Sequence, residues 1–192
     1  VNTQVTDPNL LQTSYMYDAF GRRTRETRPD GTYTERAYVD CSGSGCVNTH
    51  NKMLIVDTER TNSGSAIRDS YQYLDRLDRL LVTRSQRVTG AYNRTDREYD
   101  DFGRVSRESM PCTWSAAGTA CTFWTTYTYD LADRISQVSR PTSDSDATPA
   151  VTSSFPEGLT TRVVDALGKQ RSTATNVRGM VARSADHAGY YQ

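Results

Sequence analysis

Histidines, cysteines and aspartates are the residues in this chain whose types could do chemistry. His50 and His187 are the only side chains that ordinarily titrate near neutral pH. Neither lies beside a nucleophile motif or a zinc-protease motif. The aspartates are numerous, but nearly all stand where capping of a turn explains them, so a paired-carboxylate site of the glycosidase kind is only an alternative. The sequence therefore indicates no enzyme, no catalytic residue and no cofactor.

The four cysteines form two close pairs, Cys41 with Cys46 and Cys112 with Cys121. Each pair encloses small residues between two expected strands, and an antiparallel reversal brings such ends to the ~5.5–6 Å between Cα atoms that a disulfide needs. We predict two local disulfides and hence an oxidising compartment. Free thiols in a cytosolic protein are the alternative. A zinc site is disfavoured, because neither pair has Cys-x-x-Cys spacing.

The secondary structure that positions these histidines, cysteines and aspartates is indicated by a stretch of sequence that recurs along the chain. It first reads Tyr15-Met16-Tyr17-Asp18-Ala19-Phe20-Gly21-Arg22, and it returns around Asp100 and Asp130. Weaker copies centre on Asp75 and Asp165, and a degenerate one lies at 176–179. Recurrence of this kind is typical of a repeat protein. The residues that define the copies are Tyr17, Asp18, Gly21, Arg22, Asp75, Tyr99, Asp100, Gly103, Arg104, Tyr129, Asp130, Arg134, Asp165 and Gly168.

Each copy predicts a β-hairpin. Tyr15 and Tyr17 point to one face of a strand, because side chains alternate with a period of two. The aspartate accepts hydrogen bonds from amides just ahead of it, and a glycine three positions later supplies positive φ. Asp-x-x-Gly therefore predicts a type I turn closed by a glycine bulge. Asp78 and Asp133 replace this glycine in two copies, which leaves the type of those turns open.

Tyr-Asp-x-x-Gly-Arg, followed at 29–33 by Pro-Asp-Gly-Thr-Tyr, resembles the tyrosine-aspartate repeat of the RHS family. That family includes bacterial polymorphic toxins, C components of insecticidal toxin complexes and animal teneurins. The resemblance implies tandem hairpins that form one curved, spiralling antiparallel sheet, a segment of a hollow shell that often holds a toxic domain. The family can carry an aspartyl autoprotease after its repeats. No matching segment occurs in this chain, so the resemblance assigns it no catalytic residue.

The composition of the chain indicates an all-β stack of repeats with a thin hydrophobic core. Hydrophobic residues make up 35% of the chain and the mean hydropathy is −0.71, whereas compact domains are typically ~45–50% apolar. We expect about seven imperfect repeats over residues 1–192 and an exposed loop at 141–150, for which an interdomain linker is the alternative. Strands are expected at 52–57, 68–73, 77–85, 95–99 and 123–129, with turns at 61–65, 90–93 and 154–159.

Charge and hydropathy exclude two classes of partner. The 23 basic and 23 acidic residues give no basic excess, so we expect no nucleic acid. The longest apolar run, 53–56, falls far short of the ~18–20 residues that span a membrane. The arginines that follow the turns are explained by cross-strand pairing with acidic residues.

The two ends of the chain suggest an internal piece of a longer protein. It begins without methionine, and residues 189–192 resemble the opening of another repeat. The expected partners are flanking RHS repeats of the same chain or of neighbouring copies, and an encapsulated toxin domain, in a secreted or cell-surface bacterial protein. The alternative is an extracellular self-assembling fibre or adhesion module, in which exposed tyrosines and Trp124 contact a glycan.

Overall fold

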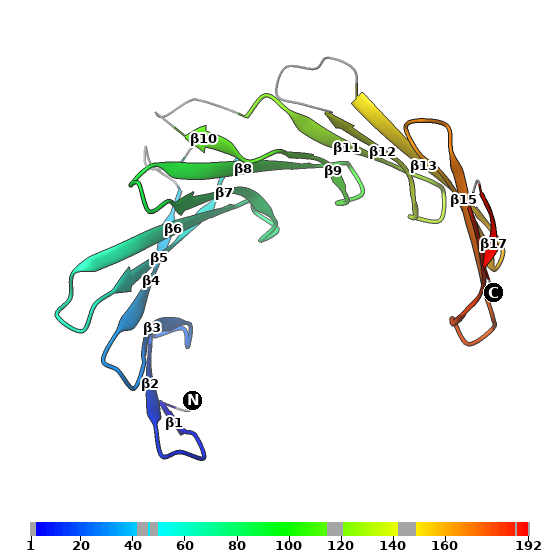
Figure 1. Ribbon diagram of the computed structural model, residues 1–192. Coiled ribbons are helices and arrows are strands. Elements are labelled where there is room, and N and C mark those ends of the chain that lie inside the picture. Colours follow the sequence, from blue (N-terminus) through cyan, green and yellow to red (C-terminus); the bar gives the residue numbers. More distant parts are fainter. Residues whose placement is uncertain are drawn as a thin grey trace. The chain divides into compact units, whose positions relative to one another are not determined.

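The computed structural model describes residues 3–41, 46, 50–114, 121–141, 149–186 and 188–191. Within these ranges the protein is all-β, with 17 strands, no helix and only antiparallel pairings (Figure 1). The expected fold class is thereby confirmed. No helix in this described part is long and apolar enough to cross a membrane.

The chain divides into two compact units, the first of which comprises residues 1–97 and 111–121. Its strands pair in chain order from β1 to β8, and β10 pairs with the outer side of β8. The strands are β1 (Gln4–Thr6), β2 (Gln12–Tyr17), β3 (Arg23–Thr27), β4 (Tyr33–Asp40), β5 (Met53–Arg60), β6 (Ala66–Leu74), β7 (Leu80–Gln86), β8 (Tyr92–Tyr99) and β10 (Cys112–Trp114).

The second unit comprises residues 98–110 and 122–192. Here β9 pairs with β11, and the ladder then continues in chain order to β17. The strands are β9 (Val105–Ser109), β11 (Trp124–Tyr129), β12 (Ile135–Pro141), β13 (Pro149–Glu157), β14 (Thr160–Val164), β15 (Gln170–Thr175), β16 (Val181–Asp186) and β17 (Gly189–Tyr191).

The expected turn at 154–159 is wrong. Strand β13 continues to Glu157, and Gly158 and Leu159 alone connect it to β14. The described pairing of β12 with β13 ends at Ser153, so Pro156 faces a ladder partner on one side only. A proline is tolerated in a strand at such an edge position.

Other boundaries also differ from expectation. The strand expected at 52–57 extends to Arg60, and the strand expected at 68–73 runs from Ala66 to Leu74. The loop expected at 141–150 is shorter, because Pro141 pairs with Pro149 in the ladder; residues 142–148 lie outside the described residues. The turn expected at 90–93 is instead formed by residues 87–91, and Tyr92 already begins β8. Strand β7 begins at Leu80 rather than at residue 77, because residues 75–79 form a turn.

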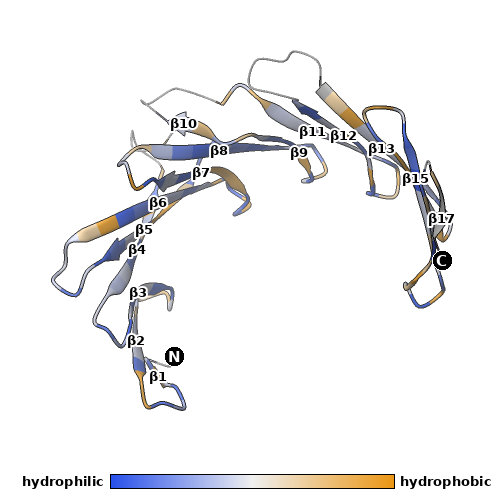
Figure 2. Ribbon diagram, viewed as in Figure 1, coloured by the Kyte–Doolittle hydropathy of each residue, from blue (hydrophilic) through white to orange (hydrophobic). Residues whose placement is uncertain are grey.

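A small core lies on one face of the first unit. Leu54, Tyr73 and Val82 form its buried centre. In the ladder, Tyr73 on β6 stands directly opposite Leu54 on β5 and Val82 on β7. Directly opposed residues share a sheet face, so the core is a patch on the face formed by β5, β6 and β7. Hydrophilic and hydrophobic residues are interspersed along most strands of both units (Figure 2). Among the described residues, five hydrophobic side chains are buried.

Candidate functional site

The turn between β2 and β3 shows how one copy of the repeat is built. The Asp18 N–H donates to the Arg22 carbonyl at 2.9 Å, and the Gly21 N–H donates to the Asp18 carbonyl at 3.0 Å. Oδ1 of Asp18 accepts from the backbone N–H groups of Phe20 and Arg22, both at 2.9 Å. Oδ2 accepts from Nε of Arg22 at 2.7 Å. One carboxylate therefore satisfies three donors, and Gly21 closes the turn at a φ of 77°.

The same pair of backbone bonds closes ten turns in the described part of the chain. In each, the N–H of the first residue donates to the carbonyl of the fifth, and the N–H of the fourth donates to the carbonyl of the first. The first residues are Asp7, Asp18, Arg28, Thr61, Asp75, Arg87, Asp100, Asp130, Asp165 and Asn176. One hairpin geometry is thus repeated along both units.

The side-chain cap of Asp18 recurs at the other predicted copies. Asp75, Asp100 and Asp130 each bind the backbone N–H and the Nε of the arginine four residues later. Asp165 makes the backbone bonds, with Lys169 in the place of arginine. The sequence analysis missed the copy at Asp7, whose carboxylate caps two amides in the same way. The Asp-Pro-Asn sequence at 7–9 is a turn signal that could have found it.

Hydrogen bonding favours the ionised form of these turn carboxylates. Desolvation acts to raise the pKa of Asp18 and of Asp100, but bonds from backbone N–H groups and from the arginine side chain outweigh it and hold each pKa below its usual value. At Asp130 the backbone bond from Arg134 has the largest effect, and its pKa is lowered as well.

The two aspartates that replace glycine adopt the conformation of glycine. The φ angle is 58° at Asp78 and 60° at Asp133, against 77° at Gly21. Their N–H groups donate to the carbonyls of Asp75 and Asp130, as the glycine N–H does. Aspartate is among the few residues besides glycine that visit this left-handed region readily. The turn type that the sequence left open is therefore the same in all of these copies.

Arginines of two turns also contact the next hairpin of their unit. The guanidinium carbon of Arg22 lies 4.1 Å from the ring centre of Tyr38 on β4, and that of Arg104 lies 4.4 Å from Tyr129 on β11. The Tyr129 hydroxyl donates to the Val105 carbonyl at 2.8 Å, and Tyr38 makes the matching contact with the first residue of β3 at 3.3 Å. Cation–π contacts therefore join neighbouring hairpins, a role that cross-strand pairing with acidic residues did not predict.

Both predicted disulfides are present. The Cα atoms are 5.6 Å apart in the Cys41–Cys46 bridge and in the Cys112–Cys121 bridge; most residues between the paired cysteines lie outside the described ones. Cys41 and Cys46 pack against the buried cluster at Tyr73. The bridges therefore do more than close loops, because the first of them covers part of the core.

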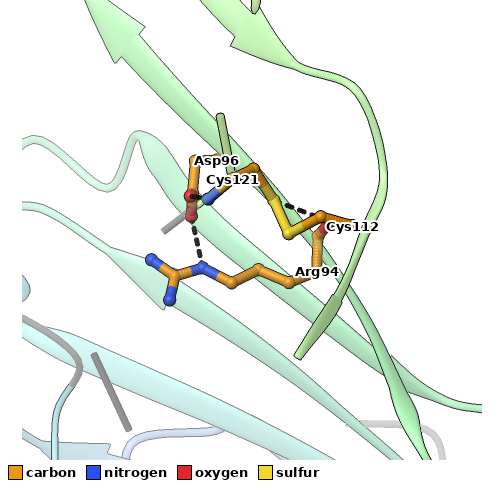
Figure 3. Close-up of a disulfide and its surroundings, with 4 residues drawn as sticks. All are labelled: Arg94, Asp96, Cys112 and Cys121. Carbon is orange, nitrogen blue, oxygen red and sulfur yellow. Dashed lines mark hydrogen bonds and ion pairs between the residues drawn. A yellow bond between two sulfur atoms is a disulfide. The ribbon is translucent and has the colours of Figure 1, made fainter. Parts of the chain in front are cut away.

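The second disulfide covers a buried ion pair (Figure 3). Nε of Arg94 lies 2.7 Å from Oδ1 of Asp96, and the two side chains are 6% and 9% exposed. Oδ2 of Asp96 accepts from the Cys121 N–H at 3.2 Å, and the Cys121 sulfur lies 3.4 Å from the Arg94 carbonyl oxygen. Asp96 stands opposite Val82 in the ladder, which places the ion pair on the same sheet face as the core. Nothing in the sequence around 94–96 signals burial.

An arginine fills an aromatic cluster on that face. The guanidinium carbon of Arg84 lies 4.4 Å from the ring centres of Tyr71 and Trp114 and 5.0 Å from that of Tyr73, whose hydroxyl accepts a bond from Arg84. Tyr92 meets Tyr71 and Trp114 edge-on at 5.7 and 5.8 Å. Burial, followed by the bond with Tyr92, raises the pKa of Tyr71 to about 12. The chain's own cation therefore occupies this cluster.

Comparison with known proteins gives one family match. Residues 3–33 match the family described as RHS Repeat. Residues 3–33 therefore carry an RHS repeat. The matched residues hold β1, β2, β3 and the turns at Asp7, Asp18 and Arg28. No curated protein matches the chain.

The RHS repeat is a structural repeat, and RHS-repeat proteins are typically extracellular or located at the cell surface. The two disulfides fit such an oxidising location. In the described part of the chain, no group of three or more His, Cys, Asp or Glu side chains could hold a metal ion. His50 is exposed, and His187 lies outside the described residues. The Trp124 ring, expected to be available to a glycan, is stacked by Arg107 at 4.4 Å.

Proposed function

We propose that this chain is a non-catalytic structural segment of an RHS-repeat β-shell. The shell would enclose or present a C-terminal toxin domain of a secreted or cell-surface bacterial protein. The observation that carries the proposal is the tenfold recurrence of one hairpin turn with the same two backbone bonds. A sheet built from such units grows by adding hairpins, as repeat proteins do.

The contacts between hairpins support a wall. Arg22 stacks on Tyr38, and Arg104 on Tyr129, so each of these turns is tied to the hairpin that follows it. Cross-strand ion pairs add to this in the first unit, where Arg36 and Asp57 bind each other through two bonds of 2.6 and 2.8 Å. These links stiffen a sheet along its length without requiring a second layer.

The distribution of polar residues also suits a wall. Five hydrophobic side chains are buried among the described residues, and the core patch lies beneath a disulfide on one face. A container has water or cargo on each side, so both faces can be polar. Strands β1 and β17, the first and last described strands, each pair with one strand in their ladders. Flanking RHS repeats of the same chain, or neighbouring copies, would pair with these edges and so prevent unspecific strand addition.

Protease protection tests the enclosure. The complete protein that contains this chain is digested under native conditions with a protease of broad specificity, and the domain that follows the repeats is detected with time. We expect this domain to resist digestion until denaturant opens the repeats, whereas the same domain expressed alone is cleaved rapidly. Equal rates of cleavage in the two settings would contradict enclosure. Filaments whose digestion is uniform along the chain would instead favour the fibre or adhesion alternative.

A further inference from the structure

One edge of the second unit carries a row of exposed apolar side chains. Its strand order places four turns side by side on this edge, the one before β9 and those joining β11 to β12, β13 to β14 and β15 to β16. Each turn holds at least one exposed apolar side chain, and we call four of these residues, one from each turn, the tip row. They are Phe102, Leu131, Leu159 and Val177, which are 83%, 108%, 55% and 91% exposed.

Hairpin formation does not explain the tip row. The central positions of a type I turn accept most residue types, so the turn geometry does not require an apolar side chain there. Within the turn, Phe102 contacts only Arg104 among the aromatic-ring contacts of the described residues, with the guanidinium carbon 4.9 Å from the ring centre. Adjacent exposed apolar residues commonly mark an interaction surface. Strands lie ~4.7–4.9 Å apart, so tips that are two strands apart recur about every 10 Å along the edge. A partner must therefore present apolar groups with a similar period.

We propose that the tip row docks against the tip row of a second copy of this chain, with the two rows antiparallel. The apolar side chains of the partner then recur with the same period, because the partner is an identical chain. The inference rests on the proposed function and deepens it, because such contacts would join neighbouring stretches of wall. A twofold arrangement of this kind requires a surface that is complementary to itself.

The charges at the two ends of the row satisfy that requirement. Asp101 is exposed in the turn at the β9 end. Asp133 lies in the next turn, where its carboxylate pairs with Arg104. Arg178 is exposed in the turn at the β16 end. Antiparallel docking places Arg178 of each copy opposite Asp101 of the other, whereas parallel docking would oppose like charges. Complementary charges of this kind set register and exclude the wrong alignment.

The size of the tip row predicts a weak interaction. Four apolar side chains bury roughly 400–600 Å² per partner, below the ~800 Å² of a standard interface. The association should therefore be detectable only at high protein concentration in this chain, and should strengthen where more turns continue the row.

Sedimentation velocity over a concentration series of the full 192-residue chain tests the proposal. We expect weak self-association, and we expect Leu131→Ser with Val177→Ser to raise the dissociation constant at least about tenfold, because two buried apolar contacts are lost. The matched control is Leu167→Ser, since Leu167 is 81% exposed in a turn on the opposite edge of the same unit. It should leave the dissociation constant unchanged. Far-ultraviolet circular dichroism checks that every variant keeps its sheet.

A charge exchange tests the antiparallel register. Arg178→Asp should weaken the association, and adding Asp101→Arg in the same chain should restore it. The proposal is overturned if the chain stays monomeric at about 1 mM, a concentration at which even weak interfaces associate. It is also overturned if the control weakens association as much as the tip-row variant, or if the charge exchange fails to restore it. Protease protection is measured on the complete protein, so failure of the enclosure and failure of tip-row docking are distinguishable.

Discussion

Replacing Arg94 by methionine should destabilise the first unit strongly. The substitution removes the cation from a pair whose side chains are 6% and 9% exposed, and the buried Asp96 carboxylate loses the positive charge that lay 2.7 Å from it. Breaking a buried ion pair by removing one partner typically costs about 3–5 kcal/mol, because the remaining charge is desolvated and uncompensated. We expect a loss of this size in the free energy of unfolding of the first unit.

The assay is urea unfolding followed by tryptophan fluorescence. Trp114 lies in the first unit and Trp124 in the second, so a Trp124→Phe background reports on the first unit alone. Arg68→Met is the matched control, because Arg68 pairs with Glu59 at the same distance of 2.7 Å while the two side chains are 57% and 36% exposed. Exposed pairs contribute about 0–1 kcal/mol, so the control should lose little stability.

A second substitution separates the buried charge from lost packing. Asp96→Asn in the Arg94→Met chain removes the charge and keeps a side-chain oxygen that can accept from the Cys121 N–H. We expect it to recover most of the lost stability. If Arg94→Met costs no more than Arg68→Met, the ion pair is not buried and the second disulfide does not cover it. If the double variant is no more stable than Arg94→Met, the buried charge is not the cause.

Three further outcomes follow from the turns and the bridges. Gly21→Val and Gly103→Val should each cost about 1–2 kcal/mol in urea melts, because valine is strained at positive φ; an added Cβ at Gly21 meets no atom within 4 Å, so undiminished stability would argue against the bulge-closed turn itself. Alkylation without reductant, read by intact mass, should modify no cysteine, and four adducts would refute the bridges. The lowered folded pKa of Asp100 contributes stability that is complete above its unfolded pKa of about 3.9 and is lost as pH falls through the folded value. Acid unfolding of Asp100→Asn should therefore depend less steeply on pH than that of the parent chain, and identical slopes would contradict this assignment.

The turns were predictable because their chemistry is local. Asp18 to Arg22 contains every group that the cap uses, so the spacing of residue types was sufficient to predict a hairpin. The same holds for both disulfides, whose cysteines lie five and nine positions apart. Asp78 and Asp133 left the turn type open only because aspartate tolerates positive φ less well than glycine does.

Contacts between distant segments could not be predicted in the same way. Arg22 reaches Tyr38 only when β3 and β4 pair in their actual register. The burial of Arg94 depends on Cys121, which is 27 residues away. Alternation along β8 gives no sign that its polar residues lie beneath another segment. The wrong prediction of a turn at 154–159 has a similar origin. Whether Pro156 can lie in a strand depends on where the pairing of β13 with β12 ends.

Electron microscopy of the complete native protein that contains this chain, combined with the mass of its particles, tests the central claim most directly. Closed hollow particles, each with the mass of a single long chain, are the result that a wall segment predicts. Filaments built from repeating subunits, or solid particles without an interior, would contradict containment as the function of these repeats.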